Sequence, residues 1–156
     1  MKERIPLDAL DERILAQLQV DASLTNADLA QRVHASAPTC MRRVKRLLKS
    51  GIIEKQVAIL ATDAFGSSLT AVVEITLDAQ GDELQRQFET LAIQEGAVLQ
   101  CYRVSPGPDF ILVVQVRDME AYHALAHRLF ASHANIRNVR AFFSIHRAKF
   151  ETRLSR

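Results

Sequence analysis

The spacing of apolar residues changes along this chain. In the first third, apolar residues recur every three or four positions, beginning with Leu7, Leu10 and Ile14, as they do on one face of a helix. From Leu69 to Leu77 they occupy every second position, which is typical of a β-strand. The sequence therefore predicts a helical module followed by a module that contains a β-sheet.

The helical module contains three predicted helices. Thr25 and Asp28 form a capping-box-like pattern at the start of the second helix. A tight turn follows, Ser36 is the expected N-cap of the third helix, and Gly51 ends that helix. Residues 52–60 are expected to form either a short wing hairpin or an extended connector.

Basic residues are concentrated on and around the third helix. Residues 31–60 carry seven basic residues and one acidic residue, a net charge of +6, whereas residues 61–156 carry ten and eleven, a net charge of −1. A capped helix, a tight turn and a basic helix together form a helix-turn-helix pattern. The predicted partner is therefore double-stranded DNA.

The predicted DNA contacts follow from side-chain chemistry. An arginine fork can bind guanine in the major groove, whereas lysines and helix N termini are suited to phosphates. The residues predicted to contact DNA are Thr25, Ser36, Thr39, Arg42, Arg43, Lys45, Arg46 and Lys49.

The second module has the predicted element order β-α-β-β-α-β. Strands are expected over residues 69–78, 98–104, 110–116 and 135–145, with a helix after the first and another after the third. This order is the ferredoxin-like arrangement, so the chain is predicted to be an α+β protein. Its helices cover one face of the sheet, and the bare face predicts self-association.

Several classes of protein and site are not expected. The longest apolar run, residues 110–114, is much shorter than the roughly 20 residues that cross a bilayer, and no signal peptide is apparent. Cys40 and Cys101 form no CxxC pair, which excludes a zinc ribbon and fits a reducing cytoplasm. No catalytic triad, phosphate-binding loop or dinucleotide fingerprint is present, so we predict a cytoplasmic protein without a cofactor, enzymatic activity or membrane association.

Two weaker patterns each have two interpretations. His123 and His127 have the spacing of metal ligands on a helix, and His133 follows, but no carboxylate or cysteine completes a set nearby. A partly solvated helix face is favoured there over a metal site. Cys40 falls on the inward face of its helix, which favours a buried, inert thiol over a redox switch.

Short motifs in both modules occur in a recognisable order. They are Leu7-Asp8 with Asp11 and Ile14-Leu15, Leu24-Thr25-Asn26 with Leu29-Ala30 and Val33, Ser36-Ala37-Pro38-Thr39-Cys40, Arg43-Val44-Lys45-Arg46-Leu47, Gly51-Ile52-Ile53, Val73-Glu74-Ile75, Cys101 with Val104-Ser105, Asp109-Phe110, and Asp118-Met119 with Tyr122. In this order the chain resembles the Lrp/AsnC family of leucine-responsive, or feast/famine, transcription regulators. The resemblance spans nearly the whole chain.

The resemblance implies an architecture and an assembly. It implies a winged helix-turn-helix DNA-binding domain over residues 1–54, a wing and linker over 55–67, a ferredoxin-like ligand-sensing and oligomerisation domain over 68–148, and a basic tail over 149–156. It also implies dimers that assemble into octamers or similar rings, and a small amino-acid effector held between dimers.

The expected effector site lies against a turn of the second module. The residues predicted to line it are Ser105, Gly107, Asp109, Ala141 and Phe143. Pro106 and Pro108 replace residues of the usual family loop and donate no N–H group, so fewer donors are available to hold a carboxylate.

Two alternatives to an effector-controlled regulator also come from this architecture. One is a tetrapyrrole-modifying enzyme similar to the sirohaem decarboxylases, which use histidine and arginine residues on the same fold. The other is an effector-sensing module with a vestigial DNA-binding head. The absence of Trp and the intact basic helix weigh against the first alternative, and the charge of +6 weighs against the second.

Overall fold

A computed structural model describes residues 5–61, 64, 66 and 68–154. The chain divides into two compact units. One contains the residues up to Ile59 together with the segment from Lys149 onward, and the other is Leu60–Ala148. Within the described residues, no helix has the length and apolar character that crossing a membrane requires.

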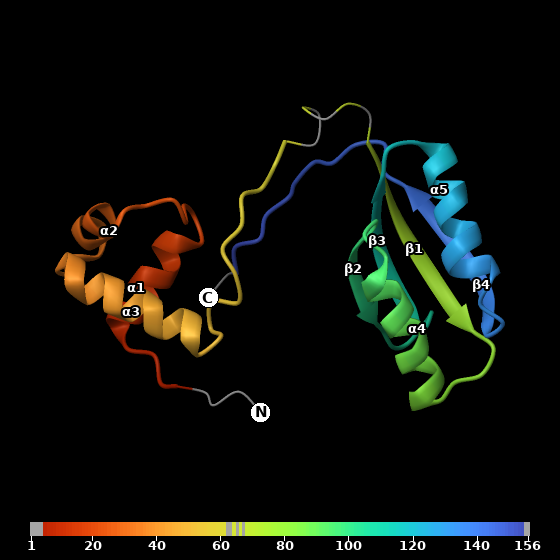
Figure 1. The fold of residues 1–156 in the computed structure, drawn as a ribbon, viewed down its shortest axis with the longest axis horizontal. Helices are drawn as coiled ribbons and strands as arrows, with labels where there is room; N and C mark the ends of the chain where they lie inside the picture. The colour runs from red at the N-terminus through yellow and green to blue at the C-terminus, as the bar shows by residue number, and fades with distance from the viewer. Residues whose placement is uncertain (1–4, 62–63, 65, 67, 155–156) are drawn as a thin grey trace. The chain divides into compact units, whose positions relative to one another are not determined.

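The first unit is built from three helices (Figure 1), which are α1 (Ala9–Leu18), α2 (Asn26–Val33) and α3 (Ala37–Lys49). Their inward faces form one core. The buried apolar side chains of that core are Ile14, Leu15, Leu29, Ala30, Val33, Cys40 and Leu47. The helical spacing in the sequence agrees with this core at Ile14, Leu29, Val33, Cys40 and Leu47, whereas Leu48, which the same spacing also places inward, is exposed.

Side-chain caps and a left-handed residue fix the ends of α2 and the start of α3. The Thr25 hydroxyl accepts the Asp28 N–H at 3.1 Å and donates to the Asp28 carboxylate at 2.6 Å. His34 adopts φ 54°, ψ 53° between the two helices, and Ser36 caps α3 by accepting the Thr39 N–H at 3.3 Å. The predicted tight turn is confirmed.

The segment after α3 is extended. Gly51 has φ 74° and ends the helix, and residues 54–61 contain neither helix nor strand. Of the two alternatives for residues 52–60, the described chain therefore adopts the extended connector rather than a wing hairpin.

The second unit is a four-stranded antiparallel sheet with two helical segments. Its elements are β1 (Leu69–Leu77), α4 (Asp82–Gln94), β2 (Val98–Arg103), β3 (Phe110–Val116), α5 (Met119–Ala126), a π-helical turn η2 (His127–Ala131) that continues α5, and β4 (Ile136–Phe143). The strand order β2-β3-β1-β4 is that of the ferredoxin-like fold. The predicted fold class is confirmed.

The two faces of this sheet differ. Both α4 and α5 lie on one side of it (Figure 1), where Val73, Phe88 and Phe110 are fully buried and the Phe88 and Phe110 rings lie 4.8 Å apart. On the other face, Val72 pairs with Phe142, and both are exposed. Among the described residues of this unit, no helix covers that second face.

Candidate DNA-binding surface and effector pocket

Three cations form an exposed stripe on α3. Arg42, Lys45 and Lys49 follow one another at three- and four-residue spacing, so they share one side of the helix. All three are exposed, and within the described structure none makes a hydrogen bond or ion pair. This stripe is a positively charged surface that is free to meet a polyanion.

The N termini of α2 and α3 add polar groups to this unit. Thr25 and Ser36 are exposed N-caps, and Thr39 is half-buried in the first turn of α3, where its hydroxyl accepts the Ser36 hydroxyl at 2.8 Å. Free N–H groups at a helix N terminus attract anions, so these ends are suited to phosphates.

The other two predicted arginines of α3 are turned toward α1. The Arg43 Nη1 atom lies 2.6 Å from Asp8 Oδ2 and 3.1 Å from Asp11 Oδ2. The Arg46 Nη2 atom also binds Asp11 Oδ2. The Asp11 side chain is completely buried, so its charge is matched by two guanidinium groups and not by water.

Asp8 has two roles in this cluster. It caps α1 by accepting the N–H groups of Leu10 and Asp11, while Asp11 accepts the Asp8 N–H at 3.1 Å. The Asp8 pKa is lowered to about 2. The hydrogen bond from the Asp11 N–H is the largest cause, and the hydrogen bond from Arg43 is the next. The Asp8 hydrogen bond in turn raises the pKa of Arg43. Both groups are therefore charged at neutral pH.

A hollow of about 340 Å³ lies at the turn between β2 and β3. Its lining residues are Gln80, Gln85, Arg103, Val104, Ser105, Gly107, Pro108 and Asp109. Three of the predicted effector residues, Ser105, Gly107 and Asp109, are thus brought together. Gly107 has φ 125°, a backbone conformation that L side chains rarely adopt.

Asp109 is part of the framework of this hollow. Its side chain is buried and accepts the Leu77 N–H at 2.7 Å. Its backbone N–H donates to the Ile75 carbonyl at 2.8 Å, and its carbonyl accepts the Val104 N–H at 3.0 Å. One carboxylate oxygen is therefore already used to join β1 to the turn.

Ala141 and Phe143 are not among the residues that line this hollow. Ala141 pairs with Val73 on β1, and the Phe143 and Tyr122 ring centroids lie 4.9 Å apart in a T-shaped arrangement. Since β1 lies between β3 and β4, the sheet order separates the two β4 residues from the turn.

Sequence reasoning missed the polar side chains that complete the hollow. Arg103 Nε donates to Glu89 at 3.0 Å, and Arg103 Nη1 lies 3.8 Å from Asp82, so its guanidinium is held beside α4. Gln80 and Gln85 belong to the segment that follows β1 and to α4. Arg103 is the next-to-last residue of the predicted strand 98–104, close to the turn, and a basic residue at this position was the signal from which the sequence could have identified it.

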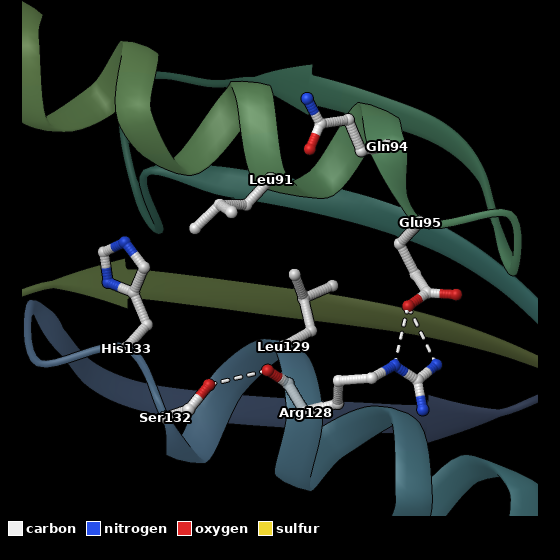
Figure 2. Close-up of a pocket in the computed structure, with 7 residues that line it drawn as sticks. All are labelled: Leu91, Gln94, Glu95, Arg128, Leu129, Ser132 and His133. Atoms are coloured by element: carbon white, nitrogen blue, oxygen red, sulfur yellow. Dashed lines mark hydrogen bonds and ion pairs between the residues drawn. The ribbon is translucent and has the colours of Figure 1, made fainter.

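A second hollow, of about 250 Å³, lies between α4 and η2 (Figure 2). Leu91 and Leu129 form its apolar part, and two hydrogen bonds of 3.0 and 2.8 Å join Arg128 to Glu95. Figure 2 shows His133 at the opposite end from this ion pair. None of the residues predicted to bind DNA or an effector lies in this hollow, although His133, which follows the two histidines at metal-ligand spacing, lines it.

The histidines and cysteines do not gather into a site. His123 and His127 are exposed, and His133 is half-buried with its ring edge-on to Phe88. Among the described residues, no three His, Cys, Asp or Glu side chains lie close enough together to hold a metal ion. Cys40 is buried, and desolvation raises the pKa of its thiol, which disfavours the reactive thiolate.

Comparison with known sequence families covers both units. A family model described as winged helix-turn-helix DNA-binding matches residues 7–54. A second model, described as the Lrp/AsnC ligand binding domain, matches residues 70–154. Together they account for most of the chain.

Individual proteins are similar over nearly the full length. An HTH-type transcriptional regulator of Haemophilus influenzae is 37% identical over 146 residues, 94% of this chain and 87% of that protein. The leucine-responsive regulatory protein of Rhizobium meliloti is 32% identical over 149 residues, 96% of each. The structure of a Neisseria meningitidis transcriptional regulator in complex with L-Met has a TM-score of 0.88 and 27% identity, and the match covers 96% of this chain and 97% of that one.

Proposed function

This chain belongs to the Lrp/AsnC family of DNA-binding transcription regulators, and we propose that it controls amino-acid-linked genes by binding specific duplex sites in the cytoplasm. The observation that carries the proposal is the exposed, unpaired cationic stripe of Arg42, Lys45 and Lys49 on α3. Thr25, Ser36 and Thr39 supply the phosphate contacts at the helix N termini.

The test of DNA binding is a mobility shift with the full chain at several salt concentrations. Specific binding that weakens as salt rises is the expected result, because cations on the protein release counterions from DNA. Lys45→Ala is expected to weaken binding to all duplexes alike and to reduce the salt dependence, since lysine binds phosphate without reading sequence. Absence of salt-dependent retention of any duplex would contradict the proposal.

The effector is proposed to be a small α-amino acid in the hollow at the β2–β3 turn. The polar lining of Arg103 and Ser105 and the left-handed Gly107 support a site for a carboxylate and an ammonium group. The related Neisseria meningitidis regulator binds L-Met. Calorimetry with all twenty amino acids tests this, with Gly107→Val as the variant expected to lose affinity; no heat with any amino acid would contradict it.

Self-association is proposed to occur through the bare face of the sheet, first into dimers and then into octamers or similar rings. Val72, Tyr102 and Phe142 are exposed on that face, and an uncovered apolar sheet face favours association. Light scattering at micromolar concentration is expected to give a dimer or larger assembly. Phe142→Glu should shift the population toward monomer, and a monomeric wild type would contradict the proposal.

We further propose that the chain has no enzymatic activity. The tetrapyrrole alternative is tested by adding sirohaem to the protein and recording the Soret region. No stoichiometric change in that region is expected, whereas saturable binding followed by decarboxylation would establish the enzyme.

A further inference from the structure

The cations of α3 fall into two groups. Arg43 and Arg46 are bound to Asp8 and Asp11 on α1, whereas Arg42 makes no hydrogen bond or ion pair in the described structure. Only a guanidinium with free donors can form the two-point contact with a guanine edge without first breaking another bond. Arg42 has its donors free for that contact.

Helical geometry places a different kind of side chain on the other flank of Arg42. Successive residues are about 100° apart around a helix, so residues 41 and 43 lie on opposite sides of residue 42. Arg43 is turned toward α1, and Met41 is therefore turned away from it. The Met41 residue is 55% exposed, although its side chain is large and apolar.

Met41 and Arg42 also lie in the part of α3 that meets bases. In a helix-turn-helix, residues in the N-terminal part of the second helix contact base edges in the major groove. Met41 and Arg42 are the fifth and sixth of the thirteen residues of α3, whereas Lys49 is the last. An apolar side chain there can contact the C5-methyl group of thymine, the one apolar group that the major groove presents.

From these placements, and resting on the proposed DNA-binding function, we propose that Arg42 and Met41 determine the sequence specificity of this chain. Arg42 binds a guanine through O6 and N7, and Met41 contacts a neighbouring thymine methyl group. Arg43 and Arg46 are positioning residues, which hold α3 against α1 and do not read bases.

The electrostatics of Asp11 explain why Arg43 and Arg46 stay with α1. The Asp11 carboxylate is completely buried and is bonded to both guanidinium groups. Moving Arg43 or Arg46 to a base would leave the buried carboxylate with only one of its two guanidinium partners, which is unfavourable in a low-dielectric interior. The cluster therefore keeps both arginines on α1 while Arg42 and Met41 meet the DNA.

The experiment uses the full chain and chemically modified DNA. A preferred duplex is first selected from a random library by the wild-type protein. Each thymine of that duplex is then replaced by deoxyuridine, which lacks the methyl group, and each guanine by 7-deazaguanine, which lacks the N7 acceptor. Dissociation constants are measured for wild type, Met41→Ala, Met41→Leu, Arg42→Ala and Arg43→Ala, with Leu48→Ala as a control at another exposed apolar position of α3.

We expect one deoxyuridine to raise the dissociation constant of the wild type about fourfold, the factor that corresponds to burying one methyl group. Met41→Ala should be insensitive to that substitution, while Met41→Leu and Leu48→Ala remain sensitive. One 7-deazaguanine should weaken wild-type binding by about 5- to 150-fold and leave Arg42→Ala unaffected. Arg43→Ala should bind more weakly but keep both sensitivities and the wild-type salt dependence, and Arg43→Lys should recover part of the affinity.

Retention of the deoxyuridine effect in Met41→Ala, or of the 7-deazaguanine effect in Arg42→Ala, would overturn the assignment. Loss of the 7-deazaguanine effect in Arg43→Ala would show that Arg43 reads the base instead. If the wild type selects no duplex at all, the proposed function itself fails, and this outcome is distinct from a selected duplex whose sensitivities do not depend on Met41 or Arg42.

Discussion

Replacing Asp109 tests whether the second unit needs this carboxylate for its stability. Asp109 was predicted from the sequence to line the effector site, but its buried side chain accepts the Leu77 N–H at 2.7 Å. Asp109→Ala removes the acceptor and leaves that N–H without a partner beside β3. We therefore expect the variant to lose stability even when no amino acid is present.

The magnitude follows from the burial of this bond. An unsatisfied buried donor costs about 1–3 kcal/mol, and a hydrogen bond to a charged group contributes about 1.5–3 kcal/mol. Because Asp109 is only 6% exposed, little solvent can replace the lost partner. The expected loss is about 2 kcal/mol, which corresponds to about 1 M in the urea midpoint for an m-value near 2 kcal/mol/M.

The protein supplies its own probe for this measurement. The chain has no Trp and two Tyr residues, Tyr102 and Tyr122, and both lie in the second unit. Tyrosine fluorescence during urea unfolding therefore follows this unit alone. Asp109→Asn keeps a carbonyl acceptor and should lose less than Asp109→Ala, and Ser105→Ala, at an exposed position of the same turn, should be close to wild type.

A particular result would refute this reasoning. If Asp109→Ala unfolds within about 0.5 kcal/mol of wild type while losing all affinity for an amino acid, the carboxylate serves the ligand and not the framework. That threshold is the range expected of ordinary surface substitutions. Equal losses of stability in the Ala and Asn variants would also contradict the role of the oxygen acceptor.

Three further predictions concern other parts of the two units. Phe88→Ala should cost the second unit about 3–5 kcal/mol in urea unfolding, because the ring is fully buried against Phe110. The Asp8 pKa falls from 3.8 to about 2 on folding, so the stability that its ionised form provides is complete above about pH 4 and is lost as the pH falls toward 2. Asp8→Asn should therefore flatten the pH dependence of thermal unfolding over that range, measured by circular dichroism. Gly107→Ala should lower the free energy of unfolding of the second unit by about 1–3 kcal/mol. The loss comes from the positive φ of 125° and not from a clash, because the added Cβ would meet open space.

Local features of the fold were predictable from the sequence, and long-range pairings were not. The Ser36 cap and the turn before it depend on residues close in sequence, so the pattern of side chains was sufficient. The Arg43 partner, Asp11, is 32 residues away, and its burial depends on how α1 packs against α3. From the sequence, all basic residues of the predicted recognition helix therefore appeared equally able to contact DNA. The structure shows that two of them, Arg43 and Arg46, are paired with Asp8 and Asp11.

The candidate effector site also combines residues that are close in sequence, which could be predicted, with residues distant in sequence, which could not. Ser105, Gly107 and Asp109 share one turn, so chain connectivity alone brings them together. Ala141 was placed with them by resemblance, but the strand order inserts β1 between β3 and β4. In a ferredoxin-like sheet the last strand is a neighbour of the first, and a residue on it cannot be assigned to the β2–β3 turn from sequence alone.

Fewer cations of residues 31–60 are free to contact DNA than their net charge suggests. Residues 31–60 contain seven basic residues, but two of them, Arg43 and Arg46, are paired with acids on α1 that lie outside this segment. Five cations therefore remain to displace counterions from DNA. Since each phosphate contact contributes about 0.9 to the slope of log K against log salt, residues 31–60 should contribute no more than about 4.5 to the slope per subunit, compared with about 6.3 if all seven took part. A smaller slope in Arg43→Ala than in wild type would mean that the arginines of the cluster leave α1 when DNA binds.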